Sequence, residues 1–208
     1  MSTTVTAPTQ AGSRTRLLSW PVIAWGLWDW GSAAFNAVIT TFVFTVYLVS
    51  DSFGAKADNE SALSLGLAIA GLFIALLAPV TGQRSDRGGR TVFWLGGYTA
   101  VVVAVSAALF LVRPEPGYLW FGIVLLGIGN IFFELASVNY NAILNHLAPK
   151  DRIGAVSGLG WGMGYLGGIV LLLILYVALV GPSPLVSFSA GSGMGVRVAM
   201  LVSAAWFG

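Results

Sequence analysis

The chain has 208 residues, of which 57% are hydrophobic and only 9% are charged, with a formal net charge of +2. A soluble domain usually carries about 25% charged residues, so this composition excludes an ordinary water-soluble globule and indicates a protein of the lipid bilayer. Cysteine is absent, which excludes a disulfide framework, thiolate chemistry and a cysteine metal site. We expect no cofactor, no metal ion and no nucleic-acid partner.

Apolar runs divide the chain into membrane spans. Residues 1–19 are polar and rich in Ser and Thr, and they are predicted to form a disordered cytoplasmic tail. The run at 20–49 is much longer than the apolar core of a signal peptide, which has about 7–15 residues, so it predicts an uncleaved first span. About 20 apolar residues cross a bilayer. Further spans are predicted at 63–80, 92–112, 118–144 and 153–180, and a sixth apolar run covers 196–208.

The sixth apolar run is too short to cross a bilayer, and no turn or charge closes it. We therefore expect the sequence to be the front part of a longer protein, whose remaining half would pack against this one. The alternative is a complete small protein that dimerises.

Lys and Arg residues predict the orientation of the spans. With the N-terminus placed inside, the inner segments hold seven of these residues and the outer segments hold three, which is the expected inward bias. We therefore predict a multi-pass integral membrane protein with a cytoplasmic N-terminus. The inner residues are Arg14, Arg16, Arg84, Arg87, Arg90, Lys150 and Arg152, and the outer ones are Lys56, Arg113 and Arg197.

Asp29 and Glu134 are the acidic residues inside the predicted spans. An ionised carboxylate at the bilayer centre costs about 2.5–3.5 kcal/mol even on a lenient scale, so such groups normally face protein or a water-filled cavity. We hypothesise that one acid or both take up and release a proton, or bind a cation or an amine, in a cavity. At about 100° per residue, the residues that share a face with Asp29 are Trp25, Ser32, Asn36 and Thr40, and those that share a face with Glu134 are Asn130, Ser137 and Asn141.

Other readings of the two polar faces remain open. Interhelical hydrogen bonds that only hold the bundle together would explain the asparagines and serines, but they fit two acids without basic partners in the five complete spans poorly. An intramembrane hydrolase could use the two acids as a carboxylate pair. The sequence contains no H-E-x-x-H, G-x-S-x-G or P-loop motif, so we predict that the protein is not an enzyme. A receptor-like or structural membrane protein is a further alternative.

Glycines repeat along the fifth predicted span. Gly160, Gly164 and Gly168 are four residues apart and are predicted to form a smooth face for close helix packing. Residues 162–167 also spell G-x-G-x-x-G, but no strand precedes this motif and no acid follows it, so dinucleotide binding is rejected.

The basic segment at 82–90, which we expect to be a loop between the second and third spans, carries Gly82-x-x-x-Asp86-Arg87-x-Gly89-Arg90. This pattern resembles the signature loop between the second and third helices of the major facilitator superfamily, and it departs from that signature where Thr91 replaces a common basic residue. More narrowly, residues 25–33, 139–144 and 157–168 are similar to the vacuole-effluxer-like branch, which includes autophagy-related amino-acid exporters and bacterial relatives. Together these motifs cover most of residues 20–170.

The resemblance implies a fold and a function. The fold would be all-helical, the N-terminal six-helix half of a twelve-helix major facilitator fold, truncated in the sixth helix. The function would be secondary active transport of a small solute, amino acids in the first instance, by alternating access with proton coupling, in a bacterial plasma membrane. Asp86 and Arg90 would belong to a loop network that holds one access state closed. A sugar or glycoside cation symporter is the alternative within transport.

Overall fold

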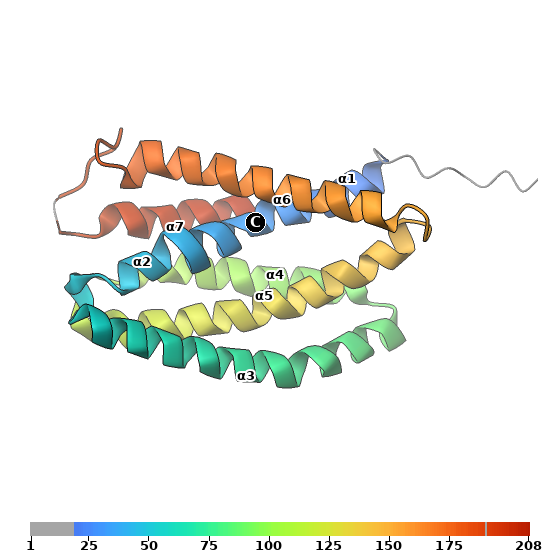
Figure 1. The fold of residues 1–208 in the computed structure, drawn as a ribbon, viewed down its shortest axis with the longest axis horizontal. Coiled ribbons are helices and arrows are strands. Elements are labelled where there is room, and N and C mark those ends of the chain that lie inside the picture. Colours follow the sequence, from blue (N-terminus) through green and yellow to red (C-terminus); the bar gives the residue numbers. More distant parts are fainter. Residues whose placement is uncertain (1–18, 190) are drawn as a thin grey trace, which may run out of the picture.

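The computed structural model describes residues 19–189 and 191–208, and of residues 84–88 only the backbone. The tail expected at residues 1–19 lies, apart from Ser19, outside these described residues. The main helices lie side by side along the long axis of the molecule (Figure 1). In chain order, the elements are α1 (Trp20–Ala33), η1 (Ala34–Phe42), α2 (Phe44–Leu48), η2 (Asp51–Phe53), α3 (Lys56–Gly88), α4 (Thr91–Ala108), η3 (Leu109–Leu111), η4 (Pro116–Tyr118), α5 (Leu119–Leu147), α6 (Ile153–Leu175), η5 (Tyr176–Val180) and α7 (Met194–Phe207).

Five helical stretches within the described part of the chain are long and apolar enough to cross a membrane. Several of their apolar side chains point outward. On α3, Leu72 and Leu76 are 60% and 63% exposed, and only 6% of the most apolar 18-residue segment of that helix is buried. Lipid is the solvent that suits such a surface. The five stretches are Trp20–Leu48, Lys56–Gln83, Thr91–Leu111, Pro116–Leu147 and Ile153–Val180.

Three helix pairs pack most extensively: α4 with α5, α1 with α6, and α3 with α5. The larger core cluster joins η1, α2, α4, α5, α6 and α7 around fully buried side chains such as Phe35, Phe44 and Leu126. A smaller cluster around Trp25 and Tyr140 joins α1 to α5 and to the start of α6. The smaller cluster therefore connects α1 to both α5 and α6, which is the arrangement on which the candidate site depends.

The first predicted span is not one continuous α-helix. The stretch η1 is a π-helix, and at its end the backbone N–H of Val43 donates to the carbonyl of Val38, five residues back, over 2.9 Å. The hydroxyls of Thr40 and Thr41 both donate to the carbonyl of Asn36, over 2.6 and 2.8 Å. Hydroxyls that bond to nearby carbonyls compete with the regular helical ladder, and π-helical stretches are often found at functional sites.

The segment at 82–90 also differs from the loop that we expected. The helix α3 continues to Gly88, and the turn is confined to Gly89 and Arg90. Gly89 has a φ of 59°, the left-handed conformation in which glycine commonly ends a helix. Polar residues can extend a helix beyond the hydrocarbon because water satisfies their side chains, so a change in polarity does not by itself end the helix.

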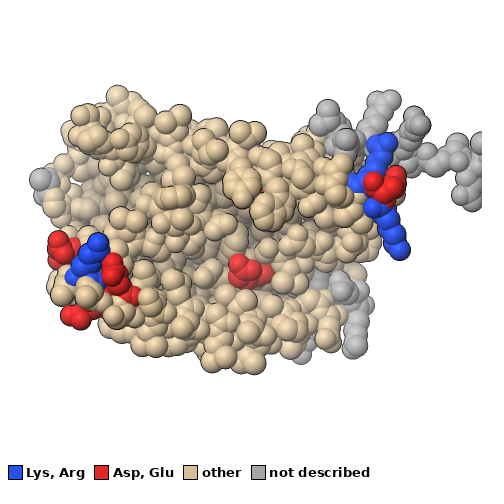
Figure 2. All heavy atoms as spheres, viewed as in Figure 1, with Lys and Arg blue, Asp and Glu red and all other residues tan. Residues whose placement is uncertain are grey.

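Charged side chains gather at the two ends of the bundle. Figure 2 shows Lys, Arg, Asp and Glu side chains at both ends of the long axis and, on this face, an acidic group in the otherwise uncharged middle. This distribution is the one expected if the hydrocarbon layer surrounds the middle of the bundle.

Candidate functional site

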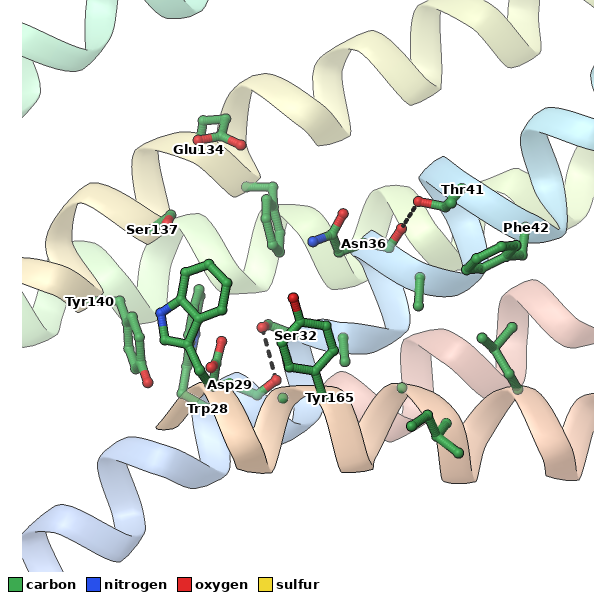
Figure 3. A pocket seen from close by; sticks show the side chains of 18 of the residues that line it. Trp28, Asp29, Ser32, Asn36, Thr41, Phe42, Glu134, Ser137, Tyr140 and Tyr165 are labelled. Carbon is green, nitrogen blue, oxygen red and sulfur yellow. Dashed lines mark hydrogen bonds between the residues drawn. The ribbon is translucent and has the colours of Figure 1, made fainter. Parts of the chain in front are cut away.

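A cavity of about 460 Å³ lies between α1, η1, α5 and α6, and both intramembrane acids line it. Figure 3 shows Asp29 and Ser32 on α1, Glu134 and Ser137 on α5 facing them, and Tyr165 rising from α6. We refer to this space as the central cavity. Its other lining residues are Trp28, Ala33, Asn36, Ala37, Thr41, Phe42, Phe133, Tyr140, Asn141, Trp161, Gly164, Gly168, Ile169 and Leu172.

The close approach of α1 and α6 positions Asp29. Its carboxylate lies against the backbone of Gly164, where no side chain intervenes. One turn further along α1, the hydroxyl of Ser32 donates to the backbone carbonyl of Asp29 over 3.1 Å. The acid is therefore held at the contact between two helices while it remains partly accessible from the central cavity.

Trp28 is fixed from two sides. Its indole N–H donates to the hydroxyl of Thr99 on α4 over 2.9 Å. Its ring stacks on Tyr140 with centroids 4.4 Å apart, and Tyr140 in turn stacks on Trp25 at 4.3 Å. Stacked aromatic pairs add about 0.5–1.5 kcal/mol beyond the area that they bury. A column of three rings therefore forms a rigid connection between α1 and α5 beside the central cavity.

The structure places four of the seven predicted lining residues in the central cavity: Ser32, Asn36, Ser137 and Asn141. Trp25 lies outside it because its ring is buried against Tyr140 and its indole N–H donates to the Tyr140 carbonyl over 3.0 Å. Thr40 and Asn130 also lie outside. In the case of Thr40 the reason is the π-helix, whose wider turn shifts the residues that share a face with Asn36, so Thr41 lines the cavity instead.

The aromatic lining of the central cavity was not predicted from the sequence. Helical spacing places Trp28 about 100° from Asp29, away from the polar face. Trp161 and Tyr165 are four residues apart on either side of Gly164, and their rings lie 6.1 Å apart. This spacing of two aromatics around a glycine is the signal that could have revealed them. The aromatic lining residues that were not predicted are Trp28, Phe42, Phe133, Tyr140, Trp161 and Tyr165.

The predicted glycine face lies against the first span. A Cβ atom added to Gly160 would lie 2.5 Å from the ring of Trp25, and one added to Gly168 would lie 3.4 Å from the Cβ atoms of Ala33 and Ala37. Gly164 lies between these contacts, against Asp29. The glycines therefore bring α6 close to α1 along several turns, as small residues do between membrane helices.

The residues of the predicted loop motif lie at one end of the bundle. Gly82 is in α3, where an added Cβ atom would lie 3.3 Å from Val138 of α5. Gly89 and Arg90 line a second hollow with the last turn of α5, which contributes Asn145 and His146. The side chains of Asp86 and Arg87 lie outside the part of the chain that the structure describes.

The central cavity has the size of a small-molecule site and a lining that combines acidic, polar and aromatic side chains. Its volume lies within the usual range for small-molecule sites, about 300–1,000 Å³. No Lys, Arg or His occurs among its lining residues, all of which are described. Within the described residues there is also no group of three or more His, Cys, Asp or Glu side chains that could hold a metal ion.

Comparison with known proteins identifies the family. The family model described as the Major Facilitator Superfamily matches residues 4–172. An uncharacterised MFS-type transporter of Bacillus subtilis (strain 168), YxiO, is 30% identical over 193 residues, which cover 89% of this chain and 43% of that protein. The chain thus spans less than half the length of this relative. No solved structure matches the chain significantly.

These matches confirm the superfamily that the motif at 82–90 indicated, and the helical structure confirms the all-helical fold class. Together with the five apolar helices, they support an integral, multi-pass membrane protein. The chain belongs to the major facilitator superfamily.

Proposed function

We propose that this chain provides the N-terminal half of a secondary active transporter that moves a small solute by alternating access and couples this movement to protons. The observation that carries the proposal is the central cavity, because both intramembrane acids line it from facing helices. Membership of the superfamily supports transport in general. In this proposal the N-terminus is cytoplasmic and the membrane is a bacterial plasma membrane.

The two acids give the proposal its mechanism. An ionised carboxylate at mid-membrane depth costs about 2.5–3.5 kcal/mol, and a proton or a bound cation removes that cost. Alternating access requires that a bound proton or solute change the balance between two conformations. A ligand shifts that balance only by the difference between its affinities for the two conformations. Asp29 and Glu134 are therefore proposed to exchange a proton or a cationic solute during the transport cycle.

Amino acids are the first substrates to test. The proposal rests on the segments at 25–33, 139–144 and 157–168, which resemble the vacuole-effluxer-like branch. All three segments contribute residues to the lining of the central cavity, including Trp28, Asp29, Tyr140 and Trp161. The similarity therefore includes residues that could contact a solute. Asp86 and Arg90 are proposed to belong to the network that closes one access state.

Proton coupling can be tested with the complete gene product in proteoliposomes. Asp29→Asn and Glu134→Gln should each abolish solute-driven proton movement while membrane insertion is unchanged. Glu115→Gln is the matched control, since it makes the same chemical change at an exposed residue between α4 and α5. Unchanged coupling in both cavity variants would exclude this function.

A further inference from the structure

The central cavity combines acidic groups with aromatic rings and has no positive charge of its own. Asp29 and Glu134 supply the negative charge, and no basic residue occurs in the lining. The aromatic side chains that line it are Trp28, Phe42, Phe133, Tyr140, Trp161 and Tyr165. This combination favours a positively charged guest, since the faces of aromatic rings attract cations and carboxylates pair with them.

The rings are concentrated around Asp29. Trp28 precedes it on α1 and is fixed by Thr99 and Tyr140. Trp161 and Tyr165 belong to α6 on either side of Gly164, against which the Asp29 carboxylate lies. Figure 3 shows Tyr165 extending from α6 toward the space between Asp29 and Asn36. One acid therefore shares the cavity with three rings that come from the two helices that meet at Gly164.

The three rings differ in exposure. Trp28 is half-buried and held in place, whereas Trp161 and Tyr165 are 63% and 66% exposed within the described chain. A fixed ring next to two exposed rings suits a cationic group, as in the aromatic cages that bind alkylated ammonium groups. Glu134 lies on the opposite wall of the cavity, so it is not part of this arrangement.

A solute carboxylate is disfavoured in the same place. It would meet Asp29 in this wall, Glu134 on the opposite wall and no basic partner in the cavity lining, and like charges in a low-dielectric site repel strongly. The described residues therefore distinguish the two ends of a solute: an ammonium group has partners here, and a carboxylate has none.

We infer that the central cavity binds the ammonium group of the transported solute, with Asp29 as its counter-charge and the rings of Trp28, Trp161 and Tyr165 around it. This inference rests on the proposed transport function and divides the roles of the two acids: Asp29 holds the cation, and Glu134 is left for the coupled proton. The ammonium group can belong to a free amine or to an amino acid, and these two sources can be separated by experiment.

Three probes with the same hydrocarbon part separate the possibilities. Leucine carries an ammonium and a carboxylate group, 3-methylbutylamine carries only the ammonium group, and 4-methylpentanoate carries only the carboxylate group. Binding to the purified complete gene product is measured through the rise in its melting temperature with ligand concentration. We expect 3-methylbutylamine, leucine or both to bind, and 4-methylpentanoate not to bind. If only leucine binds, the site takes amino acids; if only 3-methylbutylamine binds, the site takes free amines.

Variants test the assignment to Asp29. Asp29→Asn should weaken binding of the ammonium probe by about tenfold or more, and Trp161→Leu by about threefold to tenfold. Glu134→Gln should weaken ammonium binding less than Asp29→Asn does, and it should abolish proton coupling. Trp120→Leu is the control for Trp161→Leu, because Trp120 is 52% exposed on α5 and lies outside the cavity lining. The inference is overturned if neither ammonium probe binds, if 4-methylpentanoate binds equally well, or if Asp29→Asn binds the ammonium probe as the native chain does.

The inference and the proposed function can fail separately. Asp29-dependent binding of an ammonium probe without solute movement in proteoliposomes would leave the inference standing and exclude transport. Proton-coupled movement of a neutral or anionic solute, with no ammonium binding, would support transport and exclude the inference.

Discussion

The carboxylate of Asp29 lies directly against Gly164, so that a Cβ atom added at position 164 would lie 2.9 Å from Oδ2 and 3.0 Å from Cγ. The contact joins the acid of α1 to the glycine face of α6. Two features that the sequence shows separately, the acid in the first span and the glycine repeat in the fifth, are therefore in direct contact. The glycine permits helix packing and also leaves the space that the carboxylate occupies.

Gly164→Ala should therefore impair transport more than folding. The added methyl group meets the end of a short side chain, which can rotate away, so the bundle should still form while the carboxylate leaves its position. A misplaced functional group commonly costs tenfold or more in rate, and we expect at least about a tenfold loss of proton-coupled transport. The control is Gly162→Ala, because no atom lies within 4 Å of a Cβ atom added there. Equal transport by the two variants would contradict the role of this contact.

Gly167→Ala should instead destabilise the bundle. A Cβ atom at this position would collide with the backbone carbonyl of Trp30, and a backbone carbonyl cannot rotate away as a side chain can. Overpacking of this kind typically costs about 1–3 kcal/mol, so we expect a lower melting temperature of the detergent-solubilised protein. Gly158→Ala on the same helix is the control, since nothing lies within 4 Å of its added Cβ atom. If both variants melt at the same temperature, α1 and α6 do not pack as described.

Thr99→Val tests the anchoring of Trp28. The substitution preserves shape but removes the hydroxyl that accepts the indole N–H. A partly buried donor left without a partner costs about 1–3 kcal/mol, which should lower the melting temperature. Thr81→Val is the matched control, because the Thr81 hydroxyl donates to carbonyls of its own helix, at Leu77 and Ala78. An equal melting temperature for the two variants would show that the indole finds another partner.

The sequence is sufficient to predict that the first and fourth spans line the central cavity, but not that α6 lines it as well. Ionisable groups in apolar spans are costly, so Asp29 and Glu134 by themselves mark the two inward faces. Helical periodicity then selects Ser32, Asn36 and Ser137, which do line the cavity. This reasoning works where the helix is regular, because the angle between residues is then known.

Periodicity fails where the backbone departs from a regular α-helix and where apolar side chains are part of the site. The π-helix η1 replaces Thr40 with Thr41 in the lining, and it is accompanied by hydrogen bonds to the Asn36 carbonyl that periodicity does not reveal. Aromatic residues such as Trp161 suit lipid, core or cavity equally well. Only the packing of α6 against α1 shows which of these environments each ring occupies.

Arg197→Lys should destabilise the contact of α7 with the end of α4. The Arg197 Nε–H donates to the carbonyl of Phe110 over 2.7 Å, and the guanidinium carbon lies 4.7 Å from the centroid of the Phe110 ring. That carbonyl belongs to η3, at the end of the helical stretch, where the last carbonyls lack partners within the helix. A lysine provides neither the planar group nor the same hydrogen-bond direction, so we expect a loss of about 1–2 kcal/mol and a lower melting temperature. Arg113→Lys makes the same exchange at an exposed residue and should change little. Equal melting temperatures for the two variants would mean that the charge of Arg197, rather than its fork of N–H groups and its flat face, holds α7 in place.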